Sequence, residues 1–164
     1  CGWTVGKRLV QFERSTHAGI NISGSQGGRT EESQLPGLVA HYAGKVDGRI
    51  ADASIRTWLT QHEMNTHAQQ ITQRRAIAEL QSRAPGFTSS AVKLTNALNI
   101  QDGDELLMTA MGNSAYHWDT DSGASEGEVA AVKKWLYQKS LTIAGGTKEV
   151  QLNIIAKRVL GLPD

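Results

Sequence analysis

The sequence predicts an all-α fold, an antiparallel bundle of about four to six helices, on three observations. Apolar residues recur at three- to four-residue spacing over several long stretches, as on one face of an amphipathic helix. No stretch alternates apolar and polar residues for long enough to form a sheet. Short joints rich in Gly, Ser and Pro separate the helical stretches, which favours antiparallel packing of neighbours.

The first half of the chain contains three predicted helices. Pro36 fits the first turn of the second helix, and Asp52 is a plausible N-cap for the third. Gly44 and Gly48 end the second helix, and residues 23–28 form a flexible joint by composition. The three helices are expected over residues 3–22, from Leu35 to Tyr42 or Ala43, and from Asp52 to the Pro85-Gly86 pair.

The second half contains three more predicted helices. Gly103 gives the first of them a site for a kink or a break, and residues 113–127 form a polar loop. Thr147 is a good N-cap for the last helix, which Gly161 and Pro163 stop. The helices are expected from a cap at Ser89 or Ser90 to Met111, from Val129 to Leu141, and from Thr147 to Gly161.

Composition excludes several classes of protein. The chain has 164 residues, and 17 Lys and Arg against 16 Asp and Glu leave no basic excess for a nucleic acid. A single cysteine, Cys1, rules out a disulfide framework. No apolar run approaches the roughly 20 residues of a membrane span, and no signal peptide is visible, so we expect a cytoplasmic protein. The start at Cys1, without Met, indicates a fragment of a longer protein.

Few residues suggest chemistry by themselves. His62 and His67 are five positions apart, a poor spacing for two metal ligands on one helix face, so we expect ordinary helix histidines and no metal site. Gly145-Gly146-Thr147 allows a partner to approach the backbone closely, and the helix start behind it suits a strongly accepting group. A purely structural turn before an N-cap explains the same pattern.

The end of the chain resembles a known family. Residues 143–151, Ile-Ala-Gly-Gly-Thr-Lys-Glu-Val-Gln, and the run Ile155-Ala-Lys-Arg-Val-Leu-Gly-Leu-Pro163 resemble the C-terminal signature of acyl-CoA dehydrogenases. Gly2-Trp3, followed by Glu13-Arg14, is similar to the first helix of the C-terminal domain in that family, and residues 90–94 resemble another of its segments. The resemblance therefore spans the chain, with a looser middle.

This resemblance implies a domain and an activity. Residues 1–164 would be the C-terminal helical domain, which in the family follows a helical N-terminal domain and a β-domain. The family binds FAD where these domains and two subunits meet. It oxidises an acyl-CoA to the 2,3-enoyl-CoA in lipid catabolism and passes the electrons to an electron-transfer flavoprotein. We therefore expect a homo-oligomer or one subunit of a heteromeric dehydrogenase.

The resemblance also implies site residues. Many members carry the catalytic base just before the Gly-Thr of the terminal motif, where this chain has Gly145. Another branch, which includes isovaleryl-CoA dehydrogenase, places the base on the first helix of the domain, in a Glu-Arg pair that Glu13-Arg14 matches. Glu13 is therefore the expected base. The other expected contacts are Arg14, Gly145 and Gly146 for the substrate, and Lys45, Gly112, Thr147 and Glu149 for FAD.

Two departures from the family pattern leave a second function open. Where the family has an Arg-x-x-Phe segment that contacts the flavin pyrophosphate, this chain offers only Lys45. A Gln-x-x-Gly-Gly-x-Gly-Tyr loop is reduced to residues 109–116, which keep only Gly112 and Tyr116 in place. A non-catalytic scaffold subunit is the alternative, as in bacterial relatives that pair two different subunits. An unrelated helical interaction module is disfavoured by the terminal motif.

Overall fold

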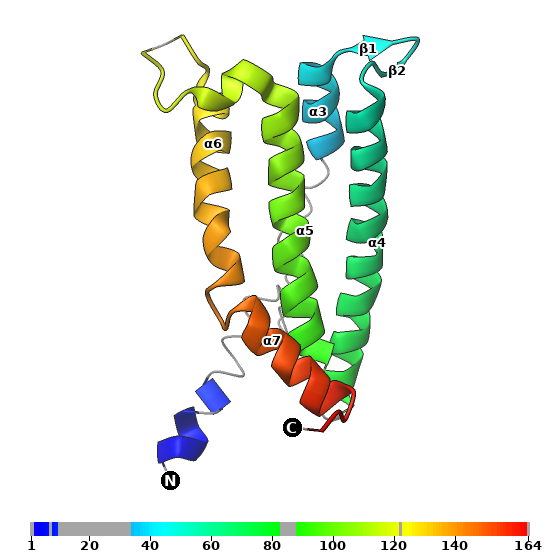
Figure 1. Cartoon of the computed structure of the whole chain (residues 1–164), viewed down its shortest axis with the longest axis vertical. Coiled ribbons are helices and arrows are strands. Elements are labelled where there is room, and N and C mark those ends of the chain that lie inside the picture. The colour runs from blue at the N-terminus through cyan, green and yellow to red at the C-terminus, as the bar shows by residue number, and fades with distance from the viewer. Residues whose placement is uncertain (1, 7, 10–33, 83–87, 122, 164) are drawn as a thin grey trace. The chain divides into compact units, whose positions relative to one another are not determined.

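A computed structural model describes residues 2–6, 8–9, 34–82, 88–121 and 123–163 (Figure 1). They are helical apart from turns and one small hairpin, so the predicted all-α class is confirmed. Residues 2–6 and 8–9 are helical, in agreement with the start of the first expected helix. Most of that helix and the joint after it lie outside the described residues.

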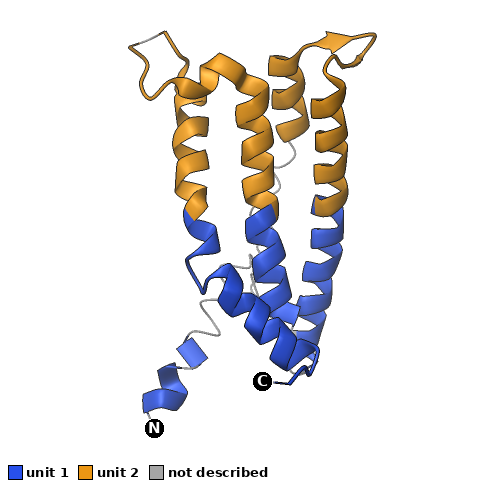
Figure 2. Cartoon of the chain, in the orientation of Figure 1, with its two compact units in different colours: residues 1–26, 66–98, 140–164 blue, residues 27–65, 99–139 orange. Residues whose placement is uncertain are grey.

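The chain divides into two compact units (Figure 2). Unit 1 comprises residues 1–26, 66–98 and 140–164, and unit 2 comprises residues 27–65 and 99–139. The two longest helices, α4 (Ala53–Gln81) and α5 (Thr88–Met111), contribute one part to each unit. Against the sequence prediction, α4 ends before Pro85, and α5 begins one or two residues before the expected cap.

Unit 2 contains the parts of α4 and α5 that lie nearest to the hairpin. It holds α3 (Leu35–Ala43), β1 (Lys45–Val46), β2 (Arg49–Ile50), the 3-10 helix η1 (Gly112–Tyr116) and α6 (Glu126–Gln138). Leu35, Val39, Ile50, Leu59 and Leu106 form its larger apolar core.

The hairpin was not predicted, because strands of two residues are too short to show alternation. Lys45 pairs with Ile50 and Val46 with Arg49. Asp47 and Gly48 form the turn, with φ of 51° and 74°. An Asp-Gly pair with two positive φ angles is typical of a tight hairpin, and this was the signal available in the sequence.

Within unit 2, α4 and α5 are joined by a part-buried group of polar side chains. Asp102 on α5 accepts a hydrogen bond from Trp58 Nε1 at 2.8 Å and is hydrogen-bonded to the buried His62 through Nδ1 at 2.9 Å. The sequence allowed a kink or a break at Gly103, but α5 continues through this residue without a break. A Cβ on Gly103 would lie 2.8 Å from His62 Cε1, so the glycine makes room for the His62 ring.

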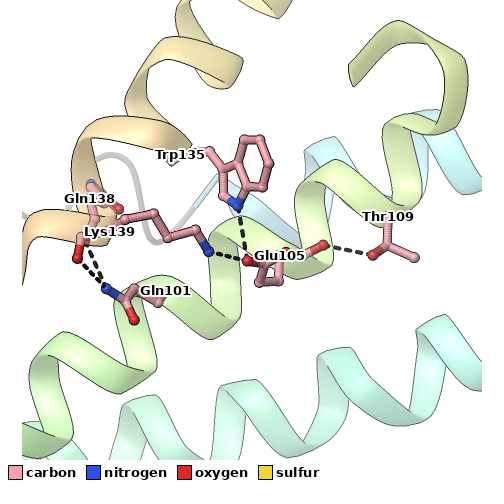
Figure 3. A network of polar contacts seen from close by, with 6 residues as sticks. All are labelled: Gln101, Glu105, Thr109, Trp135, Gln138 and Lys139. Carbon is pink, nitrogen blue, oxygen red and sulfur yellow. Dashed lines mark hydrogen bonds and ion pairs between the residues drawn. The ribbon is translucent and has the colours of Figure 1, made fainter. Parts of the chain in front are cut away.

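The contact between α5 and α6 is a polar network that we call the α5–α6 clamp: Gln101, Glu105, Trp135 and Lys139 (Figure 3). Glu105 accepts a hydrogen bond from Trp135 Nε1 at 3.0 Å and forms an ion pair with Lys139. Gln101 Nε2 donates to the carbonyl oxygens of Gln138, at 2.9 Å, and Lys139, at 3.3 Å. Gln138 is the last residue of α6 and Lys139 is its C-cap, so Gln101 donates to carbonyls at the C-terminal end of this helix.

Helix α6 begins three residues before the predicted start. Ser125 is its N-cap: the Ser125 side chain accepts from the Glu128 N–H, and the Glu128 carboxylate accepts from the Ser125 N–H. This capping box, Ser-x-x-Glu, satisfies two backbone donors reciprocally. The prediction was wrong because it started the helix at the first apolar residue, Val129. The helix also ends earlier, at Gln138, and a 3-10 turn, η2 (Lys139–Thr142), follows.

Unit 1 contains the other parts of α4 and α5. Gln69 Nε2 donates to the Val92 carbonyl at 3.1 Å, and Thr88 donates to Glu79 at 2.7 Å. Positions later on α4 thus contact positions earlier on α5, as expected for antiparallel helices. The last helix is α7 (Lys148–Ile154), which passes into a π-helical turn, η3 (Ile155–Val159).

Candidate functional site

The terminal turn, residues 145–147, leads into α7 in unit 1. Gly145 and Gly146 have φ of 66° and 101°, a region that side chains other than glycine rarely adopt. Thr147 is the N-cap of α7, as predicted, and its hydroxyl accepts from the Val150 N–H at 3.4 Å. The two glycines are therefore required by the backbone, and the threonine fixes where the helix starts.

Two buried side chains hold the carbonyls of this turn. Lys93, on the unit 1 part of α5, is 2% exposed and its Nζ donates to the Gly146 carbonyl at 2.6 Å. Gln151, on α7, is fully buried, and its Nε2 donates to the Gly145 carbonyl at 2.9 Å. We call Lys93 and Gln151 the turn latch.

The absence of a side chain on Gly146 leaves room for the Gln151 side chain. A Cβ added there would lie 2.7 Å from Gln151 Nε2 and 3.5 Å from Val150 Cγ1. The sequence pattern allows either an approaching ligand or a purely structural turn. The structure gives the glycine an internal reason, and ligand contact at Gly145 and Gly146 stays a prediction.

Thr147 and Glu149 present polar groups on the exposed side of the terminal turn. Hydrogen bonds from the backbone N–H of Glu149 and from the Thr147 hydroxyl hold the pKa of the Glu149 carboxyl below its usual range. Glu149 is exposed and Thr147 half-buried. An ionised carboxylate beside a hydroxyl accepts hydrogen bonds from hydroxyl or amino groups, and the contact of Thr147 and Glu149 with a cofactor stays a prediction.

The other two predicted cofactor residues belong to unit 2. Lys45 is exposed in β1, and Gly112 is exposed where η1 begins, with φ of 56° and open space where a Cβ would be. Lys45 supplies a point charge, which suits a phosphate less specifically than the fork of an arginine. The position three residues after Lys45 is Gly48 of the hairpin turn, so no aromatic side chain accompanies it.

Glu13 and Arg14 lie outside the described residues. Their expected roles as base and substrate contact rest on the resemblance in sequence.

Unit 2 contains a cavity of about 760 Å³ between α3, α5 and α6. This volume is in the range of small-molecule sites. Apolar side chains such as Leu38, Leu107 and Met111 line it together with the charged Asp104, Glu128 and Lys134. None of the described residues that the sequence assigned to substrate or cofactor lines this cavity.

One tyrosine at this cavity has an altered acidity. Burial raises the pKa of the Tyr42 hydroxyl, and the neighbouring Glu128 carboxylate raises it further. The Glu128 carboxyl has a lowered pKa, because the backbone and side chain of Ser125 donate to it. Tyr42 thus stays protonated and is suited to donate a hydrogen bond.

The turn latch was missed in the sequence, although a signal was present. Ser90, Lys93 and Ala97 are spaced as on one helix face, and all three are buried. A lysine among small residues on such a face needs a partner, because a buried charge is costly without one. The sequence does not reveal which group it bonds.

In the part of the chain that the structure describes, no three His, Cys, Asp or Glu side chains come together as metal ligands would. No helix among the same residues is long and apolar enough to cross a membrane.

Comparisons with known proteins agree with the resemblance. The family model "Acyl-CoA dehydrogenase, C-terminal domain" matches residues 1–160. The chain is 30% identical to "Acyl-CoA dehydrogenase IpdE1" of Mycobacterium tuberculosis over 99% of this chain and 38% of that protein. It is 28% identical to the protein of the same name from Mycolicibacterium smegmatis, over 99% of this chain and 37% of that protein. The chain thus spans less than two-fifths of these relatives. No solved structure matches.

Proposed function

The chain belongs to the acyl-CoA dehydrogenase family through its C-terminal domain, and from this premise we propose that it serves an FAD-dependent acyl-CoA dehydrogenase. Residues 1–164 form the C-terminal helical domain of a longer protein, which oxidises an acyl-CoA to its 2,3-enoyl-CoA. The observation that carries the proposal is the family match over residues 1–160, which includes the terminal turn with its two positive-φ glycines.

The reaction needs a base for a weakly acidic α-proton. Glu13 takes this role, because it matches the base position of the branch whose terminal motif lacks a glutamate before Gly-Thr. A carboxylate acts best as a base when burial raises its pKa toward the working pH. Backbone N–H groups at Gly145 and Gly146 donate to the thioester carbonyl and stabilise the enolate-like charge that develops there. Arg14 positions the substrate.

The cofactor supplies one part of the chemistry. When bound, FAD supplies the acceptor for the β-hydride. Thr147 and Glu149 hold its hydroxyl groups, and Lys45 and Gly112 contribute a point charge and an open backbone. An electron-transfer flavoprotein then receives the electrons.

A scaffold subunit of a heteromeric dehydrogenase is the second candidate. It is supported by the exposed Lys45 and by Gly48, the turn glycine at the position where the family segment carries an aromatic residue. Such a subunit would keep the fold and lose the flavin.

The visible absorption spectrum of the full-length protein distinguishes the two. A flavin band that is bleached by one of a series of acyl-CoAs supports the dehydrogenase. A colourless protein that purifies with a flavin-containing partner supports the scaffold, and a colourless protein without a partner contradicts both.

The assignment of the base has its own test. Glu13→Gln should keep the flavin band and slow the bleaching by substrate at least a hundredfold, in the range of general-base catalysis. Glu63→Gln, a matched change of an exposed glutamate on α4, should leave the rate within about twofold. Unchanged bleaching in Glu13→Gln would remove Glu13 from the mechanism.

A further inference from the structure

The terminal turn is a flexible sequence held in one conformation. Two adjacent glycines have more conformational freedom in the unfolded chain than any other pair of residues, so fixing them is entropically unfavourable. The carbonyls of Gly145 and Gly146 are nevertheless both bonded, each to a different buried side chain. Lys93 comes from α5 and Gln151 from α7, so the turn is tied to two helices of unit 1.

The turn latch is built from residues that a core does not favour. Lysine is rarely buried to 2% exposure, and an apolar residue would fill the same helix face without desolvating an ammonium group. Gln151 also has a buried Oε1 with no hydrogen-bond partner among the described residues. An unsatisfied buried oxygen reduces stability, so an amide at this position needs a reason. The hydrogen bond from Gln151 Nε2 to the Gly145 carbonyl supplies one.

Gln151 and Gly146 are also matched in shape. The Gln151 amide lies 2.7 Å from where a Gly146 Cβ would be, so the amide occupies space that only glycine leaves. The latch and the glycines therefore act as one unit, with the two carbonyls directed inward.

Two residues that the proposed function assigns to flavin, Thr147 and Glu149, follow the glycines of this turn directly. With the carbonyls of Gly145 and Gly146 held inside, the exposed carboxylate of Glu149 and the half-buried hydroxyl of Thr147 stand at the surface. We infer that Lys93 and Gln151 are positioning residues, which hold the terminal turn in the conformation that contacts acyl-CoA and flavin. This inference rests on the proposed function, and neither residue touches the reacting atoms.

The α5–α6 clamp provides matched controls, because it also uses a lysine and a glutamine. Lys93→Met and Gln151→Met in the full-length protein remove the two donors of the latch. Lys139→Met and Gln101→Met remove the corresponding donors of the clamp, which belongs to unit 2. All four variants replace a polar side chain by an unbranched apolar one.

Steady-state kinetics and flavin content give the first measurement. The two latch variants should lower kcat at least tenfold or raise the fraction of flavin lost on gel filtration at least tenfold, since pre-organisation acts on the bound complex. The two clamp variants should change both by less than about threefold. Latch variants that fold and behave as the clamp variants do would overturn the inference.

Amide hydrogen exchange gives a second measurement that needs no flavin. Compared with the wild type, peptides covering residues 143–151 should exchange at least tenfold faster in Lys93→Met and Gln151→Met. In the clamp variants, the peptides that exchange faster should instead be those covering residues 136–142. A colourless and inactive wild-type protein would contradict the proposed function, whereas unchanged exchange at residues 143–151 would contradict the latch itself. If Lys93→Met fails to fold, Gln151→Met carries both measurements.

Discussion

The turn latch in unit 1 and the α5–α6 clamp in unit 2 use the same two residue types in different settings. Both place a lysine and a glutamine against backbone carbonyls or a carboxylate. Lys93 is 2% exposed and donates to the Gly146 carbonyl, whereas the Lys139 side chain is 41% exposed and pairs with Glu105. Gln151 donates to the carbonyl of Gly145, which has a positive φ, whereas Gln101 donates to the carbonyl of Gln138 at the end of α6.

The difference shows what each network is suited to do. The clamp joins two helices through groups that water also reaches, so each of its bonds contributes little to stability but is also easily replaced. The two side chains of the latch are buried, so losing either one takes a donor from a carbonyl of the half-buried turn. A network of the second kind specifies one conformation of a turn that glycine would otherwise leave variable.

The largest effect should come from Gly146→Ala. A Cβ there combines an unfavourable φ of 101° with a 2.7 Å approach to Gln151 Nε2, so we expect a loss of about 3 kcal/mol in the free energy of unfolding. Urea unfolding of the full-length protein, followed by circular dichroism, measures it. Gly123→Ala is the control, since Gly123 has φ of 86° and open space, and should cost about 1 kcal/mol.

A double variant separates the two causes in Gly146→Ala. Gln151→Ala removes the amide that the new methyl group would meet, so the loss in the double variant should be smaller than the sum of the two single losses. Strict additivity would mean that backbone strain alone explains Gly146.

The second effect compares the two lysines directly. Lys93→Met removes a buried donor from the half-buried Gly146 carbonyl, and we expect a loss of about 1–3 kcal/mol in the free energy of unfolding. Lys139→Met breaks a half-exposed ion pair and should lose less than about 1 kcal/mol. The same urea titration measures both. Equal losses would show that burial does not distinguish the latch from the clamp.

The two networks also mark the limit of what the sequence could predict. Local patterns were sufficient for the helices and for the Thr147 cap, because amphipathic spacing and capping act over a few residues. The bond from Lys93 to Gly146 joins residues 53 positions apart, and the Trp58–Asp102 bond joins residues 44 apart. No local pattern encodes such a partner, so the sequence places Lys93 in a helix and in a segment that resembles the family, but indicates no bonding partner.

The candidate site was predicted to a different degree. Family resemblance identified the terminal turn, but it assigned both glycines to ligand contact, whereas Gly146 also has a reason inside the fold. The hairpin that carries Lys45 is a second example. Asp47-Gly48 is a turn signal, but strands of two residues show no periodicity in the sequence. Residue types alone do not separate a glycine that a ligand needs from one that a neighbour needs.

The smallest expected effect is the pH dependence of the clamp. Hydrogen bonds from Lys139 and Trp135 lower the pKa of the Glu105 carboxyl below its ordinary 4.5. In the window below pH 4.5 the unfolded chain therefore binds the proton more readily than the folded one. The stabilisation is fully present above this window and is lost as the pH falls through the lowered pKa.

Glu105→Gln should remove this component of acid sensitivity. Because the carboxylate is half-exposed, the effect is small: the difference in the free energy of unfolding between wild type and variant should shrink by less than about 1 kcal/mol between pH 7 and pH 3. Urea unfolding at a series of pH values measures it, and the comparison is needed because Glu79, Glu128 and Glu149 also have lowered pKa values. Lys139→Met removes the other partner of the ion pair, so the free energy of unfolding of this variant should also depend less on pH than that of the wild type. A difference that stays constant with pH would mean that the ion pair adds nothing to the clamp beyond the packing of Trp135.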